Sequence, residues 1–194
     1  IGVVVPDDAA RITLIRAESL PKVAEEQETF VRWKLKKTVP FDVDTAQLAF
    51  QVVASDPGGV DLLVALAPRA EIEKYEGIMD GLDLHAGFVV PSTLAALNLI
   101  AAPAQDTLFV KTAPDCVTTT IFKDGRVRFY RRVAEAGLYE SVYPTVLYYQ
   151  DKLEGAALKQ MVVCCHDSES RAAMSVLQEQ LGVPAIGMEP RTVE

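Results

Sequence analysis

The sequence predicts a mixed α/β or α+β protein of more than one lobe. Apolar runs of strand length alternate with amphipathic stretches of helical period, in the mixed order that such folds show. An Asp-Gly pair between two alternating runs at residues 117–132 predicts a β-hairpin. The length of 194 residues allows one large domain or two small ones.

The first half of the chain is predicted to contain hairpins and two longer helices. Val3–Val5 and Ala10–Arg16 are predicted to pair as a β-hairpin, with Pro6-Asp7-Asp8 near its turn. Residues 25–37 are predicted to be a helix, because acidic residues begin this segment and basic residues end it. The remaining elements expected here are strands at 48–53 and 60–66 around a turn at 56–59, a helix at 68–79, a strand at 85–90 and a helix at 91–100.

The second half begins with a predicted strand at 107–111 and the hairpin around Lys123-Asp124-Gly125. In that hairpin, Asp-Gly supplies the positive φ values of a tight turn. A helix is predicted to begin at Pro144 and continue to Leu153. Further expected elements are a strand at 161–165, a helix at 170–181 ended by Gly182, and a strand at 183–188.

Composition limits the classes of function. Hydrophobic residues make up 49% of the chain, which is typical of a globular protein. The formal net charge of -8 argues against nucleic-acid binding through the overall field. Cys116, Cys164 and Cys165 form no spaced disulfide framework, which predicts a reducing compartment. The chain shows no signal peptide and no membrane-span pattern. It starts on the apolar run Ile1–Val5 without a Met, so we expect a piece of a longer protein.

Motifs for common enzymatic chemistry are missing from the sequence. It contains neither a dinucleotide-binding nor a P-loop glycine pattern, and no nucleophile-elbow motif. No catalytic residue and no metal site are predicted, although Cys164 and His166 would share one face of a strand. An alternative is an unrelated small α/β enzyme that uses Asp115, His166 or Asp167, but no motif spacing in the sequence predicts that these residues lie together.

Two sets of exposed residues leave alternatives open. The basic pairs of the second predicted hairpin strand are either a solvated edge or a site for phosphate or an acidic partner; they are Arg126, Arg128, Arg131 and Arg132. Trp33 is the only tryptophan and lies among basic residues. It is either an interface anchor or a residue of its own lobe's core.

An ordered set of segments resembles the type IV pilus assembly protein PilM. Residues 30–41 are similar to the PilM segment in which a helix is followed by a hydrophobic residue, Pro and Phe. Residues 108–133, with the Thr118-Thr119-Thr120 run and the Lys123-Asp124-Gly125 turn, look like its second phosphate-loop hairpin. The similarity covers nearly the whole chain; its other segments are 3–7, 51–53, 60–65, 71–82, 92–98, 148–150 and 177–184.

This resemblance implies an actin-like, ribonuclease H-like fold of two lobes, incomplete at the N-terminus, with an inserted α+β subdomain. The implied divisions are residues 1–20 in the first lobe, 21–89 in the inserted subdomain, 90–106 in a connecting helix of the first lobe, and 107–194 in the second lobe. The cytoplasmic domain of the type II secretion protein GspL is similar. The implied role is a cytoplasmic scaffold, peripheral to the inner membrane, that binds the tail of a PilN-like membrane protein. The pilus motor ATPase is a further expected partner.

The nucleotide site of the resembled family is altered in this chain. The family's Asp and Gly in the second phosphate hairpin correspond to Lys111 and Ala113, and Pro114 removes one N–H donor. The expected degenerate nucleotide contacts are Lys111, Thr112, Thr118 and Thr119. Magnesium chemistry without the acidic group is unfavourable, so we expect a pseudo-ATPase without a cofactor. An active ATPase, whose first phosphate loop lies upstream of Ile1 and restores ATP and Mg²⁺ binding, is the alternative.

The partner-binding groove in the resembled family lies between the first lobe and the inserted subdomain. Trp33, Pro40 and Phe41 are the residues we expect to hold the partner's tail, because an aromatic and proline surface suits an extended or helical peptide.

Overall fold

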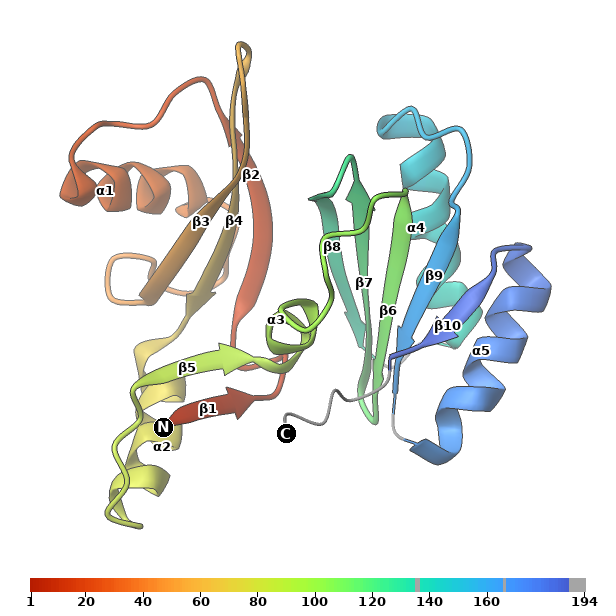
Figure 1. The fold of residues 1–194 in the computed structure, drawn as a ribbon. Coiled ribbons are helices and arrows are strands. Elements are labelled where there is room, and N and C mark those ends of the chain that lie inside the picture. Colours follow the sequence, from red (N-terminus) through yellow and green to blue (C-terminus); the bar gives the residue numbers. More distant parts are fainter. Residues whose placement is uncertain (135–136, 166, 189–194) are drawn as a thin grey trace. The chain divides into compact units, whose positions relative to one another are not determined.

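A computed structural model describes residues 1–134, 137–165 and 167–188 (Figure 1). The chain divides into two compact units, Ile1–Ala95 and Ala96–Glu194. Each unit has its own sheets and its own helices.

The first unit contains a parallel pair of short strands. Strand β1 (Gly2–Val5) pairs in register with β5 (Phe88–Pro91), so Gly2 lies opposite Phe88 and Val5 opposite Pro91. The predicted hairpin between the first two apolar runs is therefore wrong. Strand β2 (Arg11–Ala17) instead pairs with β4 (Gly59–Ala67). The physical reason is that alternation specifies a strand but not its partner, and pairing over long range was decided by tertiary packing.

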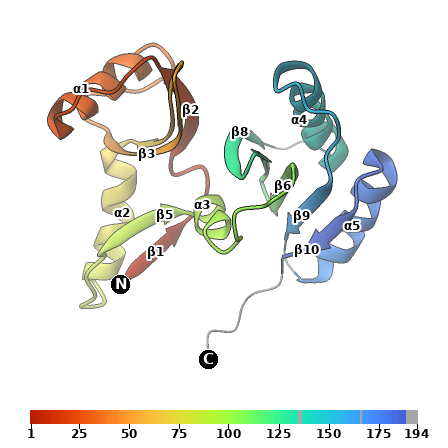
Figure 2. The same ribbon diagram turned by 45° about the horizontal axis from the view of Figure 1, so that its top comes forward.

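A three-stranded antiparallel sheet of order β2-β4-β3 forms the rest of this unit, with β3 at Gln47–Asp56. Helix α1 (Ala24–Leu35) covers one face of it (Figure 2). The core between them consists of fully buried apolar side chains, namely Val31, Leu35, Val43, Ala46, Leu62, Val64 and Leu66. The Arg32 guanidinium donates to the carbonyls of Val43 and Ala46 and so attaches the loop after α1 to the helix. Helix α2 (Arg69–Asp80) follows β4, as predicted.

The expected lobe boundaries remain predictions. The structure places β2 in one sheet with β3 and β4, whereas the boundary expected at residue 20 would assign β2 to the first lobe. Helix α3 (Ser92–Leu97) is shorter than predicted and lies where the two compact units join in sequence.

The second unit is a five-stranded sheet of order β10-β9-β6-β7-β8. Its antiparallel part is β6 (Thr107–Ala113), β7 (Cys116–Lys123) and β8 (Arg126–Ala134). The parallel part adds β9 (Gln160–Cys164) and β10 (Ala185–Gly187). The predicted hairpin is confirmed, since Asp124 and Gly125 have φ values of 55° and 71°.

Two helices pack on one face of this sheet, α4 (Leu138–Lys152) and α5 (Asp167–Leu181). Helix α4 begins six residues before the predicted start, so Pro144 lies inside it. Because proline has no N–H, the helix lacks the hydrogen bond from residue 144 to the Glu140 carbonyl. Glu140 is exposed, so water can bind this carbonyl oxygen instead.

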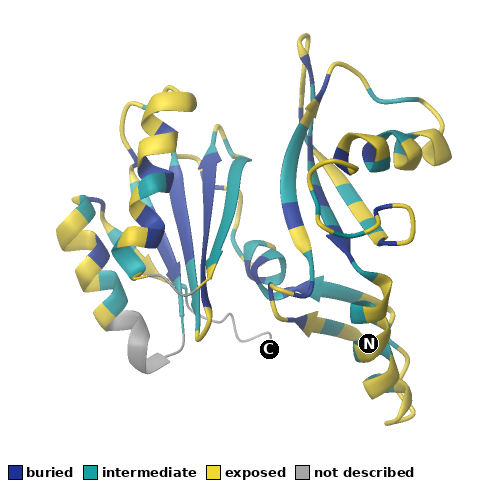
Figure 3. Ribbon diagram, turned by 180° about the vertical axis from the view of Figure 1, so that it is seen from behind, coloured by how far each residue is buried: buried dark blue, intermediate teal, exposed yellow. Residues whose placement is uncertain are grey.

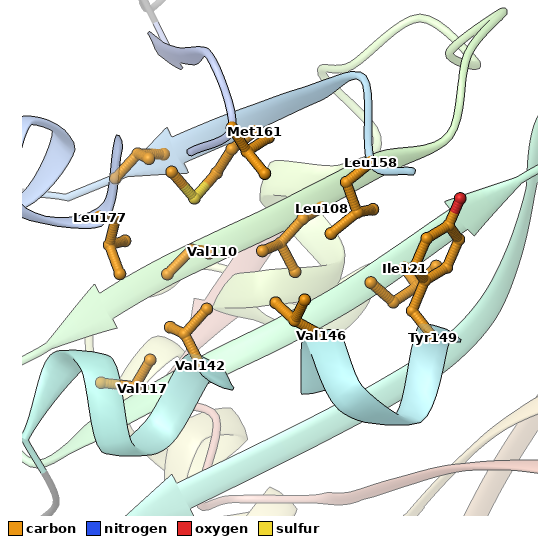
Figure 4. Packing of buried hydrophobic residues seen from close by; sticks show 12 residues of the cluster. Leu108, Val110, Val117, Ile121, Val142, Val146, Tyr149, Leu158, Met161 and Leu177 are labelled. Atoms are coloured by element: carbon orange, nitrogen blue, oxygen red, sulfur yellow. The ribbon is translucent and has the colours of Figure 1, made fainter. Parts of the chain in front are cut away.

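Alternating residues of the central strands form two apolar layers. Leu108 and Val110 face the helices, where they meet Val142, Val146 and Leu177 (Figure 4). Phe109 faces the opposite side, with Phe122, Val162 and Ala96. Strands β6 and β7 are accordingly the most deeply buried part of the sheet (Figure 3).

Candidate functional sites

The residues predicted to contact a nucleotide are divided between two faces of the five-stranded sheet. Lys111 lies opposite Thr118 in the β6–β7 pair, on the face that carries Phe109. Thr112 and Thr119 lie on the helix face, in alternation with these residues. Thr119 is fully buried, and its Oγ1 lies 2.8 Å from Oγ1 of Thr145 on α4. The structure therefore brings together Lys111 and Thr118 but not all four residues.

A polar row crosses the sheet on the face opposite the helices. Register places Arg132 of β8 beside Thr118, Thr118 beside Lys111, and Lys111 beside Cys164 of β9. Thr118 is fully buried, and its Oγ1 has no hydrogen-bond partner among the described residues. Buried hydroxyls normally find a partner, so this oxygen is an unsatisfied polar group within the sheet rather than an open contact. The sequence offered Arg132 as one of four candidates for a phosphate or acidic-partner site, but its place beside Thr118 depends on strand register.

The turn between β6 and β7 differs from a phosphate-binding loop. Pro114 supplies no N–H, and the Asp115 carboxylate lies 3.5 Å from the Arg132 guanidinium. The Asp115 carboxylate would repel a phosphate. It also pairs with Arg132, which is one of the two cations near the turn; the other is Lys111. The row therefore offers a Lys and a buried hydroxyl, but the turn adds little to bind a triphosphate.

The three residues predicted to bind a partner have different environments. Trp33 lies on the surface of α1 with 69% of its area exposed, so it is not a core residue. Pro40 is exposed, whereas Phe41 packs partly buried against the core below α1. Trp33 and Phe30 form a tilted ring pair with centroids 6.3 Å apart. They line a shallow groove of about 540 Å³ together with Glu25, Glu26 and Thr29.

A second, apolar pocket of about 70 Å³ lies within the first unit. One wall comes from the strand pair β1 and β5, with Val5, Val89 and Pro91. The other walls come from the turn before β2 and from β3, β4 and α2, and they are also mainly apolar; they consist of Ala10, Gln47, Leu48, Ala49, Ala65, Leu66, Ala67 and Ile72. No local sequence pattern indicates this pocket, because its lining is spread over residues 5–91.

The remaining predicted candidates lie apart from one another or outside the described residues. Asp124 forms the hairpin turn, and Cys164 ends β9 half-buried. His166 and the side chain of Asp167 lie outside the described part. Within residues 1–134, 137–165 and 167–188, no three His, Cys, Asp or Glu side chains gather as metal ligands. No described helix is long and apolar enough to cross a membrane.

Comparison with known proteins relates this fold to solved structures. No family profile matches the sequence, and no curated protein matches it. A chain of the PilM-PilN type IV pilus biogenesis complex is similar over 96% of this chain and 68% of its own, with a TM-score of 0.74 and 16% identity. The cytoplasmic domain of EpsL, an inner-membrane component of the type II secretion system of Vibrio cholerae, has a TM-score of 0.55 and 15% identity over 85% of this chain.

A Bacteroides thetaiotaomicron protein of unknown function with an actin-like ATPase fold is also similar, with a TM-score of 0.52 and 11% identity over 92% of this chain. This chain spans 62% of the EpsL domain and 65% of the Bacteroides protein, which is less than two thirds of each. At sequence identities of 11 to 16%, these similarities show a shared fold. The chain therefore has the actin-like ATPase fold, and the predicted resemblance to PilM and to the cytoplasmic domain of a type II secretion component is confirmed.

Proposed function

We propose that the protein is a cytoplasmic scaffold of a type IV pilus or type II secretion-like assembly platform at the inner membrane. In this role it binds the cytoplasmic tail of a PilN-like membrane protein and is peripheral to the membrane through that partner. The fold supports the role, because the similarity to a chain of the PilM-PilN complex extends over 96% of this chain. The pilus motor ATPase is proposed as a further neighbour on the resemblance alone.

The apolar pocket carries the partner assignment. It lies between the β1–β5 strand pair and the β2-β4-β3 sheet, and the resembled family binds its partner in a groove between two such parts of the chain. A pocket of about 70 Å³ suits one small aliphatic or proline side chain rather than a whole peptide. The tail would therefore seat a single apolar anchor here and continue over the surrounding surface, where Pro40 and Phe41 stay predicted contacts. Trp33 was predicted to hold the same tail, but it lines a separate groove on α1, and we assign it to a different partner.

The test is binding of a fluorescent peptide with the sequence of the tail of a PilN-like protein from the same genome. Ala49→Phe fills the pocket from β3, and we expect it to weaken binding about tenfold or more, as loss of an interface anchor does. Gln51→Phe is the matched control, because it adds the same ring two residues further along the same strand without lining the pocket. Equal affinity of both variants and the unmodified protein would reject the pocket as the tail site.

We further propose that the nucleotide site is degenerate. The supporting observation is the polar row, which holds Lys111 and no carboxylate. By the resemblance, Lys111 stands where the family has its metal-organising Asp, and Pro114 follows in the turn. Without a carboxylate there, the site lacks the group that would hold Mg²⁺ and its water. Calorimetric titration with Mg²⁺-ATP should give no binding heat. Measurable binding that Lys111→Ala abolishes would favour the alternative of an active actin-like ATPase.

A further inference from the structure

The exposed side of α1 carries an aromatic and acidic surface that the proposed tail pocket does not use. Glu26, Phe30 and Trp33 follow one another at helical spacing, while Val31 and Leu35 face the core. Among the described residues, Trp33 is the most exposed of the large apolar side chains, at 69%. The groove at this surface and the tail pocket share no lining residue.

The charges of this surface are sorted along the helix. Glu25 and Glu26 lie at its N-terminal end, and among the described residues neither carboxylate has an ion-pair partner. Two basic residues near the other end of the helix have other contacts: Arg32 binds Glu28 and two loop carbonyls, and Lys36, the C-cap, binds Asp44. The groove beside Trp33 therefore presents two carboxylates without an ion-pair partner among the described residues, and the Lys34 ammonium lies at its Phe30 ring.

The aromatic pair already holds one cation. The Lys34 ammonium lies 5.6 Å from the centroid of the Phe30 ring, within the range of a cation–π contact. Trp33 has the best aromatic face for such a contact, and that face is open to solvent. Glu25 and Glu26 line the same groove, about two helical turns from Trp33, within reach of a long cationic side chain that stacks on the indole.

We propose that this face of α1 docks a basic segment of a second partner protein. An Arg or Lys side chain of that segment stacks on the Trp33 indole and pairs with Glu25 or Glu26. Charge complementarity selects this occupant, because two unpaired carboxylates beside an open indole attract a cation. The same carboxylates repel an anionic lipid surface, which argues against direct membrane contact through Trp33.

The test measures anisotropy of fluorescein-labelled hexa-arginine with the full chain, at about 0.15 M ionic strength, where long-range attraction is screened. Trp33 is the only tryptophan, so unlabelled hexa-arginine should also change the intrinsic emission. We expect Trp33→Leu and Glu25→Gln/Glu26→Gln each to weaken binding about tenfold. Trp33→Phe should keep most of the affinity, because phenylalanine preserves an aromatic face.

The matched control is Asp151→Asn/Glu179→Gln, which removes two exposed carboxylates from other helices. Unchanged affinity in this control supports a local site, whereas a loss as large as that of Glu25→Gln/Glu26→Gln would overturn it. A blue shift of Trp33 emission with vesicles of phosphatidylglycerol and phosphatidylethanolamine, but not with hexa-arginine, would assign the face to a membrane. Dimers in sedimentation that Trp33→Leu abolishes would assign it to a second copy of this chain.

Discussion

The buried carboxylate of Asp7 joins the β1–β5 strand pair to α3 in the first unit. Asp7 has 4% of its surface exposed, and its carboxylate accepts two short hydrogen bonds from Thr93. The backbone N–H of Thr93 donates to Oδ1 at 2.7 Å, and its hydroxyl donates to Oδ2 at 2.6 Å. Val5 and Pro91, which lie close to these two residues in sequence, line the tail pocket. Loss of Asp7 should therefore affect both stability and the pocket wall.

The magnitude follows from the two bonds. A hydrogen bond to a charged group contributes about 1.5 to 3 kcal/mol net, and such contributions do not add fully when one residue makes both. We expect Asp7→Ala to lower the free energy of unfolding by about 3 kcal/mol, because the two buried donors of Thr93 lose their acceptor. Asp7→Asn keeps one acceptor oxygen and should cost about half of this, roughly 1.5 kcal/mol.

Urea unfolding followed by circular dichroism measures the loss, and hydrogen exchange of the β1 and β5 amides locates it. Asp8→Ala is the matched control, because Asp8 is the exposed neighbour and should change stability by less than about 0.5 kcal/mol. If Asp7→Ala and Asp8→Ala unfold at the same urea concentration with equal slopes, the hydrogen bonds to Thr93 do not stabilise this unit and the reasoning fails.

Three further predictions concern the two cores. Burial and the 2.5 Å bond to Asp106 raise the pKa of Tyr149 to about 12 from the ordinary 10, so its contribution to stability is complete below pH 10 and lost as pH rises through about 12. The urea midpoint should fall across this range, and less so in Tyr149→Phe; an equal fall in both would contradict this. Gly155→Ala would place its Cβ 2.1 Å from the Tyr149 ring and should cost about 1 to 3 kcal/mol in the same assay, and full stability would show that the loop moves freely. Leu35→Ala removes a side chain with 1% exposure beneath α1 and should cost about 2 to 5 kcal/mol by urea unfolding, so a loss under 1 kcal/mol would mean that this core collapses around the gap.

Residue identity predicted much of the candidate site but not its geometry. The Thr118–Thr120 run, Lys111 and the Lys-Asp-Gly turn are contiguous or nearly so, and the hairpin formed as expected. Which of these side chains meet depends on register, and a single residue along a strand decides the face. Thr119 consequently faces α4, while Thr118 faces Lys111 on the other side. The exposure of Trp33 was likewise undecided, because either face of a charged helix can carry an aromatic residue.

The sequence by itself determined the elements whose causes are local. Acidic and basic ends predicted α1, and the Asp-Gly pair predicted the β7–β8 hairpin, because helix ends and tight turns are selected by residues within a few positions. Only the tertiary structure decided that β1 pairs with β5 and β2 with β4. Several strands show the same alternation of apolar and polar residues, so the free energy of one pairing differs from that of another only through the side-chain contacts that each pairing makes. The apolar pocket depends on those pairings, and for that reason it became visible only in the folded chain.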